Sequence, residues 1–328
     1  MATTEIASPV LSKASPVESE DEKYGFKRDE MYESNLAGTM GDPYDRHVFV
    51  CYKDPTMWVS RLEASEADPF AVKLAEAFKA RSSQMTIKTR VTICEGGKGT
   101  KFEDGDALIF PDMIKYKGLT EANVESFVDE VLLNGNPWSY GKPTVLKKSH
   151  IFVCAHASRD MRCGVCGPAL IKELKSRLTS GGLNDQIAVS ACSHVGGHKY
   201  AGNLIVFNPN DKGKICGYWY GYVTPEDVPK ILDDHIGKGI VIEKLLRGKM
   251  GVYPLGDGEK AVEIIENVGM GCCQGANGGS CCRDESSEKK EGAKWSGIGN
   301  HIPLYAAAAS VGAVAAIFAV HILYKKSH

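Results

Sequence analysis

The sequence predicts an α/β protein that consists of two tandem copies of one unit, the first degenerate, followed by a C-terminal transmembrane helix. Two observations lead to this prediction. Strand-like and helix-like segments recur in the same order after about a hundred residues. An apolar segment without Asp, Glu, Lys or Arg, residues 302–323, lies near the C-terminus.

Residues 1–23 are rich in Ser, Pro, Ala and Glu, which predicts a disordered N-terminal tail. The tail lacks the pattern of a secretory signal, and it is acidic and free of arginine, unlike a mitochondrial presequence. We therefore expect a reducing compartment, where clustered cysteines bind metals or carry out redox chemistry more often than they form structural disulfides. The net charge of −2 and the absence of a long basic block predict no nucleic-acid partner.

Residues 24–145 form the first predicted unit. Apolar and β-branched or alternating runs mark its strands, and apolar residues at helical spacing mark its helices. In order, we expect a strand at 47–52, a helix at 69–82, strands at 85–94 and 106–111, and a helix at 119–132.

Residues 146–250 form the second predicted unit, in which HIFVC at 150–154 repeats HVFVC at 47–51. A helix at 168–178 with Pro168 at its start, strand-like runs at 187–197 and 203–209, and a helix at 222–236 follow in the same order. This β-α-β-β-α order is the thioredoxin-like arrangement. The sequence therefore predicts two tandem thioredoxin-like domains.

The first domain lacks most of the chemistry of the second. Cys51 and Cys94 have counterparts in the second domain, but Ser60 stands where the second domain has Cys163. Its glycine-rich segment EGGKGT contains no histidine. We therefore expect a degenerate domain that packs against the active one, with Cys51 and Cys94 as buried small apolar side chains.

Two short stretches of the second domain gather soft and borderline metal ligands. Two thiolates and two imidazoles, at Cys154, Cys163, His194 and His198, suit either zinc or a [2Fe–2S] cluster of mixed ligation. Gly196 and Gly197 allow a tight turn between the two histidines. We expect Cys192, which has a counterpart in the first domain, to be a packing residue.

Cys166 leaves two alternatives open. A zinc site would use Cys163-x-x-Cys166 with His194-x-x-x-His198, although the separation of the two pairs exceeds that of a usual zinc finger. Thiol–disulfide chemistry would use Cys163 and Cys166, placed just ahead of the predicted helix, because a helix N-terminus lowers a thiol pKa.

Three further residues are candidates for supporting the metal site. Arg159 and Arg162 lie between the first two cysteines, where they would offset cluster charge or dock an acidic electron-transfer partner. Asn203 would hydrogen-bond the backbone of the turn or a cluster sulfur.

The blocks FVCAHASRDMRCGVCGP and CSHVGGHKYAGN resemble the sucrase/ferredoxin-like family, also described as thioredoxin-like ferredoxins, over roughly residues 45–240. The cysteine-rich tail with a hydrophobic C-terminus is similar to plant members. The resemblance implies a [2Fe–2S] cluster bound by Cys154, Cys163, His194 and His198. It also implies one-electron transfer in redox homeostasis, with an unknown reductase as donor. Bacterial relatives carry cysteine at the second pair of positions, so their low potential is not expected here.

The word "sucrase" in that family name receives no support from the residues. Glycoside hydrolysis needs two carboxylates that face each other across a sugar site. Asp160 is the only acidic residue inside the two motif blocks, and we expect it to orient an arginine.

The C-terminal part is predicted to be a Cys/Gly-rich linker, 251–300, and a transmembrane tail anchor, 301–324. The apolar segment is about 33 Å long as a helix, enough to cross a bilayer. A second metal site or acylation are the candidate roles of four linker cysteines: Cys272, Cys273, Cys281 and Cys282. We expect the protein to face the cytosol on an intracellular membrane, such as the endoplasmic reticulum or the mitochondrial outer membrane.

Overall fold

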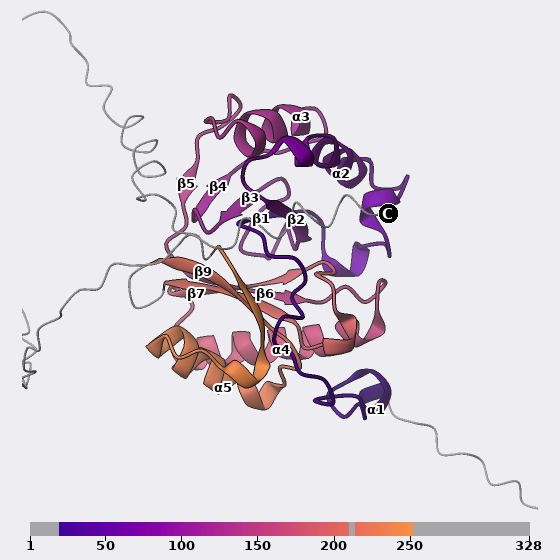
Figure 1. Ribbon diagram of the computed structural model, residues 1–328, viewed down its shortest axis with the longest axis vertical. Coiled ribbons are helices and arrows are strands. Elements are labelled where there is room, and N and C mark those ends of the chain that lie inside the picture. The colour runs from indigo at the N-terminus through magenta and orange to yellow at the C-terminus, as the bar shows by residue number, and fades with distance from the viewer. Residues whose placement is uncertain (1–19, 210–213, 252–328) are drawn as a thin grey trace, which may run out of the picture. The chain divides into compact units, whose positions relative to one another are not determined.

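The computed structural model describes residues 20–209 and 214–251, which belong to one compact unit (Figure 1). Within these residues ten strands form one sheet, in the order β10-β9-β8-β6-β7-β2-β1-β3-β4-β5. The first half contributes β1 (Arg46–Cys51), β2 (Thr89–Cys94), β3 (Ala107–Phe110), β4 (Ile114–Tyr116) and β5 (Thr144–Val145). The second half contributes β6 (Ser149–Cys154), β7 (Ile187–Cys192), β8 (Leu204–Pro209), β9 (Ile215–Tyr220) and β10 (Leu246–Met250).

Both halves have the same topology. In each, two parallel strands are connected through a helix, α2 (Pro69–Arg81) between β1 and β2, and α4 (Met161–Ser180) between β6 and β7. An antiparallel strand, β3 or β8, then pairs with the first strand of its half. The predicted α/β class is therefore confirmed, and the repeat seen in the sequence is also present in the structure.

The two halves of the sheet pack face to face. They join at one antiparallel residue pair, Cys94 with Cys192. Between them the rings of Phe49 on β1 and Phe152 on β6 stack with centroids 3.7 Å apart. Such an aromatic pair contributes about 0.5–1.5 kcal/mol beyond the burial of its area. The inner cluster also contains Trp219 and four buried cysteines that the sequence places at strand ends: Cys51, Cys94, Cys154 and Cys192.

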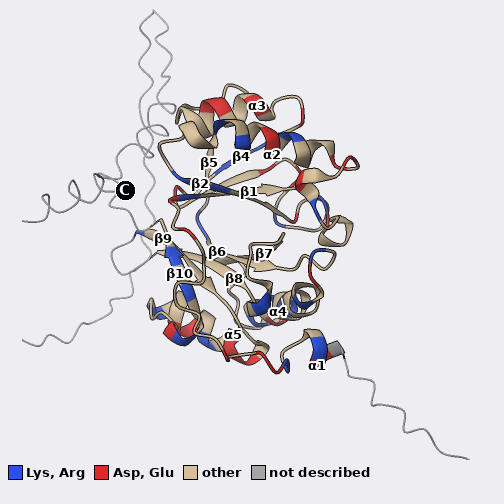
Figure 2. Ribbon diagram, turned by 45° about the vertical axis from the view of Figure 1, so that its right-hand side comes forward, with Lys and Arg blue, Asp and Glu red and all other residues tan. Residues whose placement is uncertain are grey.

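Helices cover the outer face of each half, so that the layers follow the order helix, sheet, sheet, helix (Figure 1). The first half carries α2 and α3 (Val124–Phe127), and the second carries α4 and α5 (Val228–Lys230). Charged residues lie mainly on these outer helices, whereas the strands between them are mostly uncharged (Figure 2). Short 3₁₀ turns cover Pro55–Met57, Leu62–Ala64, Ser82–Gln84, His198–Tyr200, Pro225–Asp227 and Glu243–Leu245, and π-helical turns cover Val128–Leu133 and Ile231–Ile236.

The N-terminal boundary differs from the prediction. The short helix α1 (Glu20–Tyr24) begins inside the segment predicted as a disordered tail. The Asp21 side chain accepts a hydrogen bond from the Phe26 backbone N–H at 3.3 Å, and α1 packs against α4. These contacts are made only in the folded chain, so the composition of the tail gave no sign of them.

The start of α4 also differs from the prediction. The helix begins at Met161 and contains Pro168, which was predicted to stand at its start. Cys163 and Cys166 consequently lie inside the helix rather than ahead of it.

Two predicted segments, the linker 251–300 and the tail anchor 301–324, lie outside the described residues apart from Gly251, as do Cys272, Cys273, Cys281 and Cys282. Within 20–209 and 214–251, no helix combines the length and apolar character that crossing a membrane requires.

Candidate metal centre

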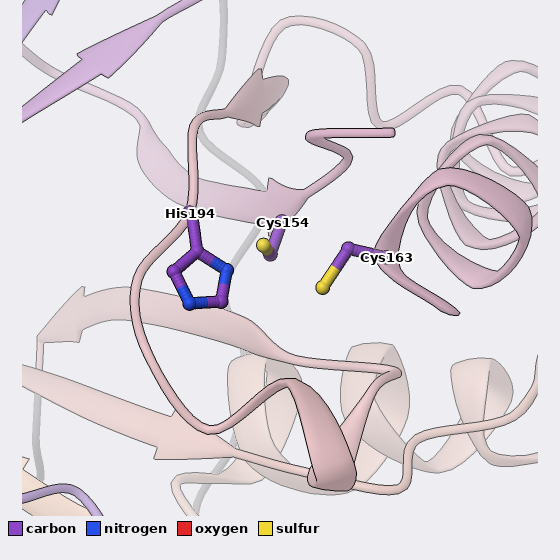
Figure 3. Close-up of side chains that lie close together, drawn as sticks. All are labelled: Cys154, Cys163 and His194. Atoms are coloured by element: carbon purple, nitrogen blue, oxygen red, sulfur yellow. The ribbon is translucent and has the colours of Figure 1, made fainter. Parts of the chain in front are cut away.

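Three predicted ligands come together in the second half. Cys154 ends β6, Cys163 lies in the first turn of α4, and His194 follows β7. One potential ligand atom of each lies within 4.8 Å of those of the other two. Figure 3 shows the His194 ring facing the two sulfur atoms. Both cysteines are buried, so their thiols are shielded from water.

Cys163 reaches this position because α4 starts very close to β6. The helix begins directly after Asp160, whose side chain accepts a hydrogen bond from the Arg162 backbone N–H at 3.0 Å. Gly167 then permits a close approach, since a Cβ there would lie only 2.4 Å from the Cys154 carbonyl oxygen. The glycines of the motif therefore serve the packing of the helix on the strand.

The local chemistry favours a thiolate in this pair. A hydrogen bond from Cys163, together with the weaker effects of nearby His194 and the Val195 backbone N–H, lowers the pKa of Cys154 well below its ordinary value, although burial opposes this. Cys163 shares that hydrogen bond, and the pKa of its thiol is raised. A thiolate is the form of cysteine that binds metal.

His194 is held through its backbone, and one nitrogen of its ring is left without a hydrogen-bond partner among the described residues. Its backbone N–H donates to Nδ1 of His156 at 3.3 Å, and Nε2 of His156 donates to the Val59 carbonyl at 3.0 Å. Nδ1 of His194 is buried and finds no hydrogen-bond partner within residues 20–209 and 214–251. Because buried polar atoms are nearly always paired, an unpaired imidazole nitrogen beside two thiols fits a metal ligand.

His198 lies beside this group but is not part of it. It begins the 3₁₀ turn His198–Tyr200, and its ring centroid is 5.5 Å from that of His194. Its side chain is 51% exposed, and its Nδ1 lies 3.8 Å from a carboxylate oxygen of Asp160. The structure thus brings three of the four predicted ligands together and places the fourth next to them.

Cys166 has different neighbours. A guanidinium nitrogen of Arg28 lies 3.2 Å from its sulfur, and its thiol donates to the Tyr24 carbonyl at 3.5 Å. Burial raises its thiol pKa. Among the described residues the metal-binding group contains Cys154 rather than Cys166, so the zinc set that includes Cys166 is not assembled. Cys192 lies in the core between the two halves of the sheet.

The three predicted supporting residues occupy different environments. Arg159 is exposed and donates to the Ser60 carbonyl at 3.3 Å. Arg162 donates to both carboxylate oxygens of Asp160, at 3.0 and 3.1 Å. Burial alone would raise the pKa of Asp160, but the hydrogen bonds and positive charge of Arg162 together outweigh it, so that the pKa is lowered. Asn203 is buried and donates to the Gly197 carbonyl at 2.9 Å, inside the turn between the two histidines.

Sequence reasoning missed three arginines around the site. Arg28 precedes the first strand, Arg90 lies on β2 of the first half, and Arg247 lies on β10. Arg247 donates to the Asn203 side-chain oxygen at 2.7 Å, and burial lowers its pKa to about 10. No local motif surrounds these arginines.

Comparisons with known proteins place the chain among related sequences. It is 45% identical over 103 residues to altered inheritance of mitochondria protein 32 of Debaryomyces hansenii, a match that covers 31% of this chain and 36% of that protein. It is 31% identical over 157 residues to actin patches distal protein 1 of Saccharomyces cerevisiae, covering 42% of this chain and 47% of that protein. The chain thus spans about a third and about half of the length of these two relatives.

A solved structure, the wild-type thioredoxin-like [2Fe-2S] ferredoxin from Aquifex aeolicus, matches at 20% identity with a TM-score of 0.25, covering 31% of this chain and 98% of that one. The model of the family described as sucrase/ferredoxin-like matches residues 36–248, which include both halves of the sheet and the whole metal-binding group. The chain therefore belongs to the sucrase/ferredoxin-like family.

Proposed function

We propose that the protein is an electron carrier whose [2Fe–2S] cluster is bound by Cys154, Cys163, His194 and His198. The observation that carries this proposal is the buried group of two thiols and the unpaired Nδ1 of His194. A bound cluster of this type supplies a one-electron acceptor and donor.

The two cysteines and the two histidines would bind the cluster from different structural elements. Cys154 and Cys163 are fixed by a strand end and a helix start, so they provide a rigid pair of thiolates. The two histidines belong to a glycine-containing turn. Because the His198 side chain is half exposed and near His194, a change in its side-chain rotamer would bring its ring to the site.

The same arrangement gives the centre one accessible side. The cysteines are buried, whereas His198 and Arg159 are exposed. We propose that a reductase and an acceptor approach this side, and that the positive charge of Arg159 favours an acidic partner. The predicted segment 301–324 would anchor the protein to an intracellular membrane, with the described residues in the cytosol.

A reductive titration under argon tests the proposal. We expect the purified full-length protein to take up about one electron per chain, reversibly, as a single [2Fe–2S] cluster does. His194→Cys is expected to lower the midpoint potential, because thiolate adds negative charge to the centre. No electron uptake by the wild-type protein, or an unchanged potential in a His194→Cys variant that retains iron, would contradict the proposed ligation.

A further inference from the structure

Three consecutive carbonyl groups in the turn between the two histidines are each held by a different side chain. Arg90 donates to the Val195 carbonyl at 2.6 Å, and Arg247 donates to the Gly196 carbonyl at 3.1 Å. Asn203 donates to the Gly197 carbonyl, as described above. The turn is therefore fixed by donors from three separate strands or loops, one of which, β2, belongs to the degenerate half.

The fit around Arg247 is tight. Gly197 has a φ of +70°, and a Cβ at this position would lie 2.3 Å from a guanidinium nitrogen of Arg247. The second glycine of the turn is thus required both by its backbone conformation and by the approach of the arginine. The remaining donors of Arg247 bind the carbonyl and hydroxyl oxygens of Thr39, at 2.6 and 3.2 Å.

In the part of the chain that the structure describes, no carboxylate pairs with either arginine. Within residues 20–209 and 214–251, the partners of Arg90 and Arg247 are neutral oxygens and aromatic rings. Both guanidinium groups lie against the ring of Trp219, with centroid distances of 4.9 and 5.6 Å. Arg247 is 2% exposed, and burying a charge without an opposite charge beside it is unfavourable.

Burial lowers the pKa of Arg247, and the groups that oppose this by favouring its charge are first Tyr200 and then, more weakly, Cys154 and Cys163, the two cysteines of the metal-binding group. Arg247 therefore lies close enough to influence the charge of the centre, although it is far from both cysteines in the sequence.

We propose that Arg90 and Arg247 are positioning residues of the metal centre, which hold the histidine turn and compensate the negative charge that the centre gains on reduction. This inference rests on the proposed electron-transfer function. It gives the degenerate half a direct role, because that half supplies Arg90 to the turn.

The physical reason is electrostatic. The two positive charges of an oxidised [2Fe–2S] core are cancelled by two thiolates, so adding one electron leaves the centre with a net negative charge. Nearby buried cations stabilise this reduced form more than the oxidised form, because screening by water is weak there. The two arginines would therefore raise the midpoint potential.

The test compares midpoint potentials of the full-length protein and four variants. Arg247→Gln keeps a hydrogen-bonding side chain without the charge, Arg247→Lys keeps the charge, and Arg90→Gln removes the charge from the degenerate half. Arg81→Gln is the control, since Arg81 pairs with Asp129 on the outer helices.

We expect Arg247→Gln to lower the equilibrium constant for reduction of the centre at least tenfold. For a one-electron couple this lowers the midpoint potential by about 59 mV. Arg90→Gln should shift the potential in the same direction, Arg247→Lys should shift it less than Arg247→Gln, and Arg81→Gln should leave it unchanged. Wild-type potentials in both glutamine variants, or equal shifts in Arg247→Gln and Arg247→Lys, would overturn the compensating role.

A second measurement covers variants that do not assemble a cluster. In the metal-free protein, the backbone amides of Gly196 and Gly197 should exchange hydrogen faster in Arg247→Gln than in wild type, with no change in Arg81→Gln. Equal exchange in Arg247→Gln and wild type would refute the positioning role. A wild-type protein without any cluster would instead contradict the proposed function, and the exchange experiment would still decide whether the arginine positions the turn.

Discussion

Replacing Cys154 by serine is expected to reduce bound iron and sulfide by more than about tenfold, whereas Cys166→Ser is expected to leave both near wild-type levels. The reason is that Cys154 belongs to the group with Cys163 and His194. Cys166 instead contacts Arg28 and the Tyr24 carbonyl. The measurement is the amount of iron and acid-labile sulfide per chain in each variant after purification without air.

The two variants control for each other, because both change one buried cysteine of the second half to the same residue. Circular dichroism of the metal-free proteins establishes whether each variant folds. Loss of iron in a folded Cys166→Ser variant, with iron retained in Cys154→Ser, would show that the ligand set includes the wrong cysteine. That result would favour the two alternatives that use Cys163 and Cys166, a zinc site or a thiol–disulfide pair.

Acidification from pH 7 to pH 4 is expected to destabilise the metal-free protein through buried histidines. Burial, and to a lesser extent Lys148, lowers the pKa of His150 to about 4. Burial likewise lowers the pKa of His235 to about 4, with a smaller contribution from Lys249. In the unfolded chain a histidine has a pKa of about 6.5. Below that pH the unfolded state binds more protons, so stability falls as the pH falls.

The size of this effect follows from the two pKa values. Each histidine lowers the free energy of unfolding by up to about 3 kcal/mol as the pH falls from about 6.5 to 4. Urea unfolding of wild type and His150→Phe at both pH values measures it. Phenylalanine suits the site because His150 lies against Phe102, Phe110 and Phe152, and because its Nε2 has no hydrogen-bond partner among the described residues. The variant should lose less stability on acidification, and identical losses would contradict the role of His150.

The strands that carry the site could be predicted because their local pattern and their packing agree. HVFVC and HIFVC are buried almost throughout, and they became the parallel strands β1 and β6. Cys154, Cys163 and His194 could be selected because each combines a metal-binding side chain with a position at the end of an element. The repeat then distinguished Cys163 and His194, which the degenerate half lacks, from Cys192, which it shares, whereas Cys154 has a counterpart in Cys51.

The start of α4 could not be predicted from local propensity. Gly164, Gly167 and Pro168 are all poor residues for a helix interior, and proline is favoured in the first turn. The structure tolerates them because Gly167 packs directly against the end of β6. Tertiary packing therefore outweighs helix propensity here, and both cysteines of the C-x-x-C motif lie inside the helix.

Strand β10 and its arginine show a second limit. LRGKM contains two basic residues and a glycine, so nothing in it resembles a buried strand. It forms because it pairs with β9, and Arg247 is buried there among neutral oxygens and aromatic rings. A similar limit applies to the helix predicted at 119–132. There the Asn123 side chain accepts from the Thr120 backbone N–H, and α3 begins only at Val124.

The visible and electron paramagnetic resonance spectra of the full-length protein, purified without air, test the central claim most directly. A [2Fe–2S] cluster bound by Cys154, Cys163, His194 and His198 predicts a red-brown protein that bleaches on reduction and then gives a spin-one-half signal. A colourless, folded protein that contains zinc and gives no such signal after reduction would contradict it.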